Sequence, residues 1–228
     1  IAGHRAPDQG RPALPVAEQC QQPADPLEVD ERVRVEVVGL LRLDAPGAED
    51  LIRSVDAAVR AGGTAQITDA LRSTLCRLIR DQAVRLPDCC FEACPDHYAR
   101  RELYQSEDLG YSVIAMTWGP RQGTLLHDHS GMWCVEGVWT GALEITQYDL
   151  VDRQEPRYRF RPVGSIQAGA GSAGSLIPPH EFHTIRNPSE DQVAVSVHIY
   201  SGPMKSCAVF RPAGDEWFER DVRQLGCD

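Results

Sequence analysis

The chain has 228 residues, of which 42% are hydrophobic, 25% charged and 7% aromatic. That composition is typical of one globular domain, and no apolar run approaches the roughly 20 residues of a membrane span. The 33 acidic and 23 basic residues give a formal charge of −10, which disfavours a nucleic-acid-binding surface. We therefore expect a protein that binds a small molecule, not nucleic acid or membrane, as a monomer or small homo-oligomer.

The first 30 residues combine five prolines with Gln, Asp and Gly, so they can bury little apolar surface. We predict a loosely ordered extension over residues 1–30, followed by a single domain over 31–228. At the start of that domain, apolar residues recur at helical spacing before and after Gly62 and Gly63. This pattern predicts two helices within about 48–87.

From about residue 98 to 212, short runs of β-branched and aromatic residues alternate with Gly, Pro and Asp turns. The predicted strands cover 111–118, 132–138, 143–150, 158–163, 175–177 and 193–200. Many short strands with no helical pattern between them favour a sandwich or barrel over a parallel sheet with crossover helices. The expected fold class is mainly β, with the N-terminal helices packed outside the barrel.

Eight cysteines are scattered irregularly along the chain, which favours free thiols over a disulfide framework. We accordingly expect a reducing compartment and a cytoplasmic protein. Cys89, Cys90 and Cys94 form a CCxxxC cluster, but it lacks the second ligand pair that a structural zinc site needs.

The histidines of the β region are arranged to converge. The string GTLLHDHSGMWCVEGVWTG holds His127 and His129, two residues apart, so in a strand both side chains point to one face. A third imidazole can come from His183 in PPHEFHTIRN, beyond a glycine-rich turn that would fold its strand back alongside the first. Three neutral imidazoles on a barrel wall would make a site for a divalent transition metal with open positions.

A second pattern lies in the string VSVHIYSGP, where alternation puts Ser196, His198 and Tyr200 on one face of a strand. The other face is apolar. Buried polar groups in a row need partners, and each can serve the next as donor or acceptor. From these residues alone, a polar stripe on the solvent face of an edge strand remains the alternative.

Together these motifs resemble the cupin superfamily. Its first motif is HxH followed by a spacer, a Glu, six residues and a Gly, and its second ends in His, three residues and Asn. His127, His129 and Gly141 match the first motif, and His183 with Asn187 matches the end of the second. The resemblance implies a cupin-type β-barrel, or jelly roll.

Cys134 stands where cupins usually have a metal-binding Glu. A cupin without that carboxylate resembles the cysteine dioxygenase family of thiol dioxygenases, and the Ser-x-His-x-Tyr row matches the signature of that family. The resemblance implies Fe(II) held by the three histidines, with Cys134 and Tyr200 close together beside it. In animal-type members that pair becomes a thioether crosslink, which Cys134 makes possible here. Glu136 is not needed as a fourth ligand.

The family also grips the substrate carboxylate with the arginine of a Tyr-x-Arg motif, because a planar guanidinium binds a carboxylate bidentately. In the string HYARRELY, Tyr98 to Arg100 matches the motif, whereas the usual distance back from the first metal histidine points to Arg101. We favour Arg100, since it would share a face with Tyr98 in an extended segment. Arg211 is a more distant candidate.

The resemblance implies an enzyme that adds both atoms of O2 to the sulfur of a small thiol carboxylic acid, with L-cysteine as the leading substrate. Alternative substrates are 3-mercaptopropionate and mercaptosuccinate. A non-catalytic, metal-binding cupin sensor is the alternative from another class. In the catalytic interpretation Tyr200, held by His198 and Ser196, orients the substrate and moves a proton.

Overall fold

The structure is a computed structural model that describes residues 45–228, so the predicted extension over residues 1–30 lies outside the described residues. The described chain begins with the helices α1 (Ala48–Val59), α2 (Thr64–Arg80) and η1 (Asp88–Phe91). It continues with the strands β1 (Ala99–Gln105), β2 (Ser112–Trp118), β3 (Leu126–His127), β4 (Cys134–Thr140), β5 (Ala142–Gln154), β6 (Arg157–Gly169), β7 (Ala173–Leu176), β8 (His183–Arg186), β9 (Ala194–Tyr200), β10 (Ser206–Pro212) and β11 (Trp217–Gln224). Within residues 45–228, neither α-helix has the length and apolar character that a membrane crossing requires.

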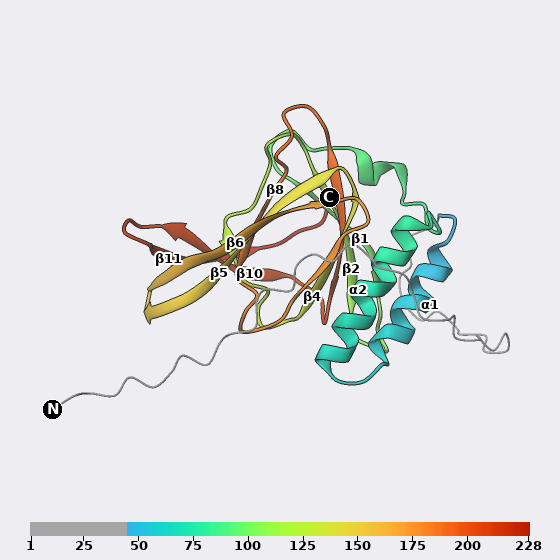
Figure 1. The fold of residues 1–228 in the computed structure, drawn as a ribbon, viewed down its shortest axis with the longest axis horizontal. Helices are drawn as coiled ribbons and strands as arrows, with labels where there is room; N and C mark the ends of the chain where they lie inside the picture. Colours follow the sequence, from blue (N-terminus) through green and yellow to red (C-terminus); the bar gives the residue numbers. More distant parts are fainter. Residues whose placement is uncertain (1–44) are drawn as a thin grey trace.

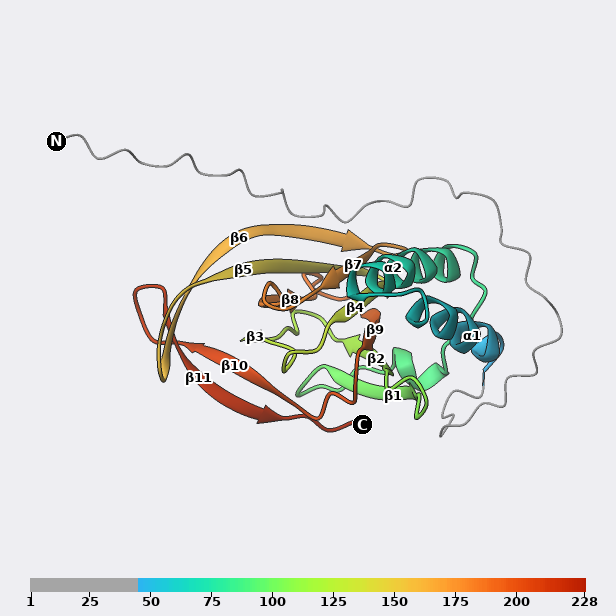
Figure 2. The ribbon, with the colours of Figure 1, turned by 90° about the horizontal axis from the view of Figure 1, so that it is seen from below.

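The strands form two sheets (Figure 1). One contains five strands in the order β1-β2-β9-β4-β7, and the other closes in the order β10-β11-β6-β5-β8-β3. Figure 2 shows the helices gathered at one end of the molecule, while the β5–β6 and β10–β11 pairs reach away from them. The mainly β fold with N-terminal helices outside the barrel is thus confirmed, and β11 lies beyond the predicted end of the barrel at about residue 212.

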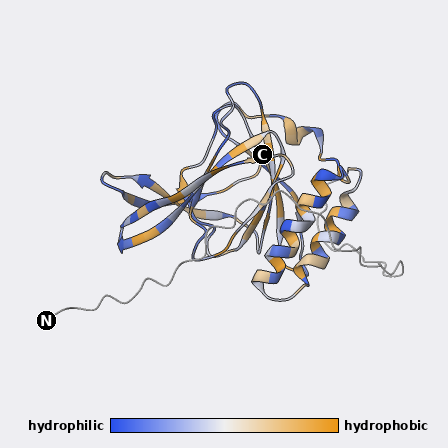
Figure 3. Cartoon of the chain, viewed as in Figure 1, coloured by the Kyte–Doolittle hydropathy of each residue, from blue (hydrophilic) through white to orange (hydrophobic). Residues whose placement is uncertain are grey.

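The two α-helices form because their apolar residues recur every three or four positions, which gives each helix one apolar stripe. Leu51 and Val55 on α1, and Leu71 and Leu75 on α2, are fully buried against the five-stranded sheet. Figure 3 shows these stripes as hydrophobic patches on helices that are otherwise polar. The helices therefore cover the outer face of that sheet.

Every residue of β9 is buried, because the strand has a hydrophobic layer on each side. Val195, Val197 and Ile199 pack with the helices in one core cluster. Tyr200, on the opposite face, belongs to the cluster between the two sheets. The polar stripe of β9 therefore lies in the interior of the barrel, and it is not on a solvent face.

Gly141 lies in the turn that joins β4 to β5. Its backbone has a φ of +75°, and an added Cβ would come within 2.9 Å of the Cβ of Ala194 on β9. Both conditions favour glycine, which accounts physically for the glycine of the first motif.

Candidate metal and substrate site

The imidazoles of the two histidine motifs come together through β3 and β8. His127 and His183 are direct cross-strand partners in this antiparallel pair. His129 lies beyond the end of β3, which contains only two residues, so the expected longer strand does not form. Asp128 turns away between the two histidines, where its carboxylate accepts hydrogen bonds from the amides of Ser130 (3.1 Å) and Ala208 (2.8 Å). These bonds hold the loop in a shape that directs His129 inward.

The three rings surround one point. Their centroids are 4.4 Å apart for His127 and His183, 5.0 Å for His129 and His183, and 5.4 Å for His127 and His129. One ligand atom from each lies within 4.8 Å of the other two. The Nδ1 atoms of His127 and His183 donate to the carbonyls of Leu125 and Glu181, at 3.0 and 2.8 Å. This arrangement leaves the Nε2 lone pairs of both rings facing inward.

Burial keeps these imidazoles neutral. It is the main cause that lowers the pKa of His127, and it lowers those of His129 and His183 well below the usual value, with the neighbouring rings adding to the effect. His183 Nε2 and His129 Nδ1 are buried without a hydrogen-bond partner among the described residues. Neutral, unpartnered ring nitrogens at this spacing fit a divalent transition metal, which needs free lone pairs and no proton competition.

A second group of donor atoms lies behind the first, formed by Cys134, Glu136 and His198 within 4.8 Å of one another. Burial raises the pKa of Glu136 to about 8 and that of the Cys134 thiol well above its usual value. Both groups are therefore protonated near pH 7 and would have to lose a proton before binding a metal. The three-histidine group, whose nitrogens are already free, is the better metal site.

Glu136 lies beside the polar row, a position to which the sequence analysis assigned no role. Its Oε2 is 3.4 Å from His198 Nδ1 and has no hydrogen-bond partner in the part of the chain that the structure describes. Alternation from Cys134 could have revealed this, because residues two apart on β4 share a face.

The Ser-His-Tyr row faces the histidines from β9. Ser196 Oγ and His198 Nε2 are 2.8 Å apart, and Trp118 Nε1 donates to Ser196 Oγ at 2.9 Å. His198 and Tyr200 instead meet by ring stacking, with centroids 6.1 Å apart and planes at 15°. The expected chain of donors and acceptors thus forms only in part: Ser196 and His198 are hydrogen-bonded, with Trp118 as a further donor, whereas His198 and Tyr200 are stacked and share no hydrogen bond within the described residues.

Tyr200 also touches two other parts of the site. Its ring lies edge-on to His129, with centroids 5.6 Å apart, and Cys134 is its direct partner across the β4–β9 pair. Burial raises the pKa of the Tyr200 hydroxyl well above its usual value, and the nearby Cys134 thiol adds to the rise. The phenol is therefore a neutral O–H donor at physiological pH.

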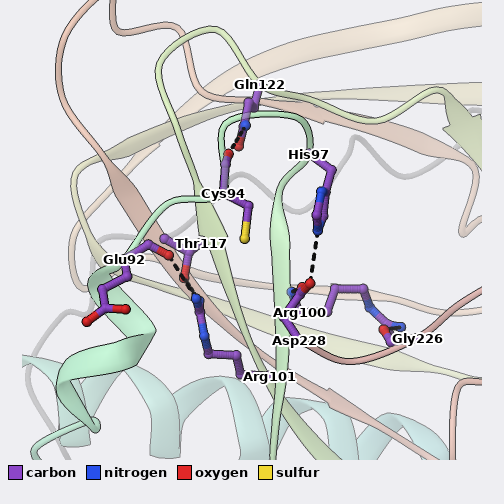
Figure 4. Close-up of polar contacts among 9 residues, drawn as sticks. All are labelled: Glu92, Cys94, His97, Arg100, Arg101, Thr117, Gln122, Gly226 and Asp228. Carbon is purple, nitrogen blue, oxygen red and sulfur yellow. Dashed lines mark hydrogen bonds and ion pairs between the residues drawn. The ribbon is translucent and has the colours of Figure 1, made fainter.

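The two neighbouring arginines point in different directions. Arg100 is 5% exposed, and its guanidinium donates to the carbonyls of Gly226 and Met204, at 3.0 and 3.4 Å. Arg101 lies on the other face of β1 and donates to Thr117 Oγ1 and the carbonyl of Glu92, at 2.8 and 2.9 Å (Figure 4). Alternation along β1 separates them, so only Arg100 reaches the site among the two.

The third arginine candidate lies outside this region. Arg211 is an exposed residue of β10, and its Nε is 3.7 Å from the carboxylate of Asp221. Its side chain points to solvent, so the structure does not bring it to the histidines. Of the CCxxxC cysteines, Cys94 lies with His97 and Asp228, and neither Cys89 nor Cys90 joins a metal-ligand group in the described chain.

A cavity of about 20 Å³ joins these groups. Its wall combines four imidazoles, one guanidinium, two phenols, a hydroxyl, a thiol and apolar side chains: Tyr98, Arg100, Met116, Trp118, Thr124, His127, His129, His183, Ile185, His198, Tyr200, Met204, Cys207 and Leu225. A cavity with three potential ligands and a buried cation is suited to a small anion beside a metal ion.

Comparison with known proteins places this arrangement in a family. The chain is 27% identical over 110 residues to cysteine dioxygenase type 1 of Danio rerio, which covers 48% of this chain and 54% of that protein. It is 25% identical over 118 residues to the human protein of the same name, with the same coverage. The chain therefore spans about half the length of the curated relatives it matches.

Among solved structures, a Klebsiella pneumoniae protein with a double-stranded β-helix domain is similar at a TM-score of 0.40 and 15% identity, over 51% of this chain and 81% of that one. A Thermus thermophilus protein is similar at a TM-score of 0.38 and 17% identity, over 49% and 90%. A sequence model of the family described as cysteine dioxygenase type I matches residues 93–212, which is just over half of the chain and contains every strand that carries the site. The chain belongs to the cysteine dioxygenase type I family.

Proposed function

We propose that this protein is an iron-dependent thiol dioxygenase that adds both atoms of O2 to the sulfur of a small thiol carboxylic acid, converting L-cysteine to cysteine sulfinic acid. One observation carries the proposal: a buried arginine, whose guanidinium has no carboxylate partner among residues 45–228, shares a 20 Å³ cavity with three neutral imidazoles. A buried positive charge is stabilised by an anionic partner, and neutral imidazoles are ligands for a transition metal. The substrate must offer one group to each.

Arg100 is the proposed carboxylate anchor. A guanidinium has five N–H donors, and its two hydrogen bonds to protein carbonyls leave the others free. Its Nε is buried and has no partner among the described residues. Leaving a buried charged donor unpaired is costly, so a substrate carboxylate that accepts a hydrogen bond from Arg100 would bind favourably.

His127, His129 and His183 would hold the metal. Ferrous iron, when bound there, supplies the redox chemistry that dioxygen needs and favours the thiolate form of a substrate thiol. The apolar members of the wall, Met116 and Leu225, exclude water from the reacting sulfur. Arg100 and the imidazoles then fix the two ends of the substrate, which turns an encounter into an aligned complex.

Tyr200 is the proposed proton donor and orienting group. Tyr200 lines the cavity together with Arg100, whose charge acts to lower the pKa of the hydroxyl against the stronger effect of burial. The ring is held by stacking on His198, which in turn is bonded to Ser196. A hydroxyl held in this way can donate to a substrate oxygen and return the proton without a rearrangement of the site.

Cys134 and Tyr200 are also positioned for the thioether crosslink of animal-type family members. They face each other directly across two antiparallel strands, and their side chains interact inside the barrel. Forming a carbon–sulfur bond breaks one C–H and one S–H bond and removes two protons and two electrons from the pair, which O2, the oxidant, accepts. Mass spectrometry of iron-loaded protein after turnover would detect the loss of two hydrogens and the linked peptides.

We further propose a cytoplasmic, reducing location. The seven cysteines within the described residues are free thiols, Cys134 among them. Thiols persist in that state where the cell keeps them reduced. The location would also supply the small thiols that the site is proposed to use.

The decisive experiment measures oxygen uptake by Fe(II)-loaded protein with L-cysteine, 3-mercaptopropionate and mercaptosuccinate. We expect thiol-dependent uptake, fastest with L-cysteine, and a sulfinic acid as product. A faster rate with either of the other acids would change the substrate but keep the reaction. Absence of uptake with every thiol would overturn the enzyme proposal and leave a metal-binding sensor as the alternative.

Metal analysis supplies the control. His183→Ala should lose iron outright, because it removes one of three ligands. His180→Ala, in the exposed loop nearby, should retain it. Equal iron content in the two variants would contradict the proposed ligand set.

A further inference from the structure

The residues that follow β11 return to the substrate site. Leu225 lines the cavity, and its amide donates to the carbonyl of Lys205 at 2.8 Å. Three residues later, Asp228 lies along the free edge of β1, the outermost strand of the five-stranded sheet. The Asp228 amide donates to the carbonyl of Arg100 at 2.7 Å, and its Oδ2 accepts from the Arg100 amide at 2.9 Å. One residue thus bonds both backbone groups of the proposed anchor.

The same segment also holds the anchor's side chain. Arg100 Nη1 donates to the carbonyl of Gly226 at 3.0 Å (Figure 4), and Nη2 donates to that of Met204 at 3.4 Å. These two bonds set the plane of the guanidinium and leave its Nε edge unpartnered. Since a carboxylate binds an arginine in the plane of the fork, the position of Gly226 decides which N–H groups the substrate meets.

The other oxygen of Asp228 is held by His97. His97 Nε2 is 2.9 Å from Asp228 Oδ1, so both carboxylate oxygens have partners (Figure 4). The hydrogen bond from His97, followed by that from the Arg100 amide, lowers the pKa of Asp228. The carboxylate is therefore ionised at neutral pH and makes charge-assisted bonds, which are stronger than neutral ones.

We propose that Asp228 is a positioning residue for substrate binding. Hydrogen-bonded to His97, it fixes the segment 225–228 against β1 and so keeps Arg100 in the orientation that binds the thiol acid. This inference rests on the proposed function for the role of Arg100. Asp228 itself touches neither the cavity nor the imidazoles, so it acts only through the anchor. Its loss affects substrate affinity and spares the chemical step.

A double-mutant cycle tests this coupling. Asp228→Ala should raise the KM for L-cysteine about tenfold, the loss expected from a charge-assisted bond, with kcat within about twofold. In the Arg100→Ala background the same change should alter KM by less than about twofold. Asp228→Asn keeps one oxygen to accept from the Arg100 amide, and its NH2 can donate to neutral His97, so it should restore most of the affinity. Asp221→Ala, which removes an exposed Asp of β11, is the matched control and should behave like the parent.

An equal effect of Asp228→Ala in both backgrounds, or a loss confined to kcat, would overturn the proposal. Hydrogen exchange gives a readout that needs no turnover. The Arg100 amide should exchange at least about tenfold faster in Asp228→Ala than in the parent or in Asp221→Ala, and unchanged exchange would also overturn it. If the parent shows no thiol-dependent oxygen uptake, the proposed function fails, and the dissociation constant of L-cysteine measured without oxygen replaces KM in the cycle.

Discussion

The two faces of the five-stranded sheet are equally buried but are stabilised differently. The outer face packs apolar side chains such as Val197 and Ile199 against α1 and α2, so its stability follows from area removed from water. The inner face buries Arg100, Glu136, His198 and Tyr200. These side chains lose their hydrogen bonds to water and replace them only in part with hydrogen bonds inside the protein. Burial therefore stabilises the outer face, whereas on the inner face it shifts pKa values and leaves polar atoms without partners among the described residues. Such shifted pKa values are typical of functional sites.

Substitutions on the outer face should change stability and spare chemistry. Ile199→Ala removes a fully buried side chain between sheet and helices, and we expect a loss of about 2–5 kcal/mol in the free energy of unfolding. Urea unfolding measures this loss, and oxygen uptake per folded molecule should remain close to that of the parent. A large fall in kcat at full folding would show that the two faces are not independent.

The reverse outcome is expected on the inner face of the same strand. Tyr200→Phe keeps the ring that stacks on His198 and removes only the hydroxyl. We expect kcat to fall about 100-fold, with iron content and unfolding free energy nearly unchanged, because proton transfer contributes about 10²–10⁴-fold. Steady-state kinetics together with metal analysis checks this. Turnover equal to the parent would remove Tyr200 from the mechanism.

Arg100 and Arg101 lie on opposite faces of β1, so substituting each in turn compares the inner and outer faces of the sheet. Arg100→Ala should raise the KM for L-cysteine about 10–100-fold, since the lost bonds to a charged group are worth about 1.5–3 kcal/mol. Arg101→Ala loses contacts with Thr117 and Glu92 only and should keep the parent KM. Should the two variants exchange these results, the anchor would be Arg101.

The energetic cost of burying Glu136 on the inner face can be measured from how the free energy of unfolding changes with pH. Its pKa is raised from 4.5 to about 8 by burial, so the folded state holds a proton that the unfolded chain has released between those values. The contribution of Glu136 to stability is therefore fully present below pH 4.5 and is lost as pH rises to about 8.

Glu136→Gln does not titrate, so its stability relative to the parent should increase by about 1 kcal/mol per pH unit over that window. Taking the difference between the two proteins removes the contributions of other titrating groups. Denaturant unfolding at pH 5, 6, 7 and 8 provides the measurement. A difference that does not vary with pH would mean that Glu136 is already ionised in the folded protein.

Short strands mark the limit of prediction from local pattern. β4, β5, β6 and β9 could be predicted because each carries a run of β-branched or aromatic residues. β3 and β8 were expected only from the histidine motifs and not from such a run, since they contain two and four residues and owe their shape to pairing with each other and with neighbouring strands. β1 was expected only as an extended segment around Arg100, because its charged residues mask its pattern. These are strands that carry the site.

The sequence by itself determined the residue types and their phase: three imidazoles in two motifs, a polar row alternating with an apolar one, and a cysteine in place of a carboxylate. Those patterns are local, because strand alternation depends only on backbone geometry. Only the tertiary structure decided which arginine enters the cavity and that residues 225–228 return to β1. These contacts join positions far apart in the chain, and their partners depend on how the two sheets close around one interior.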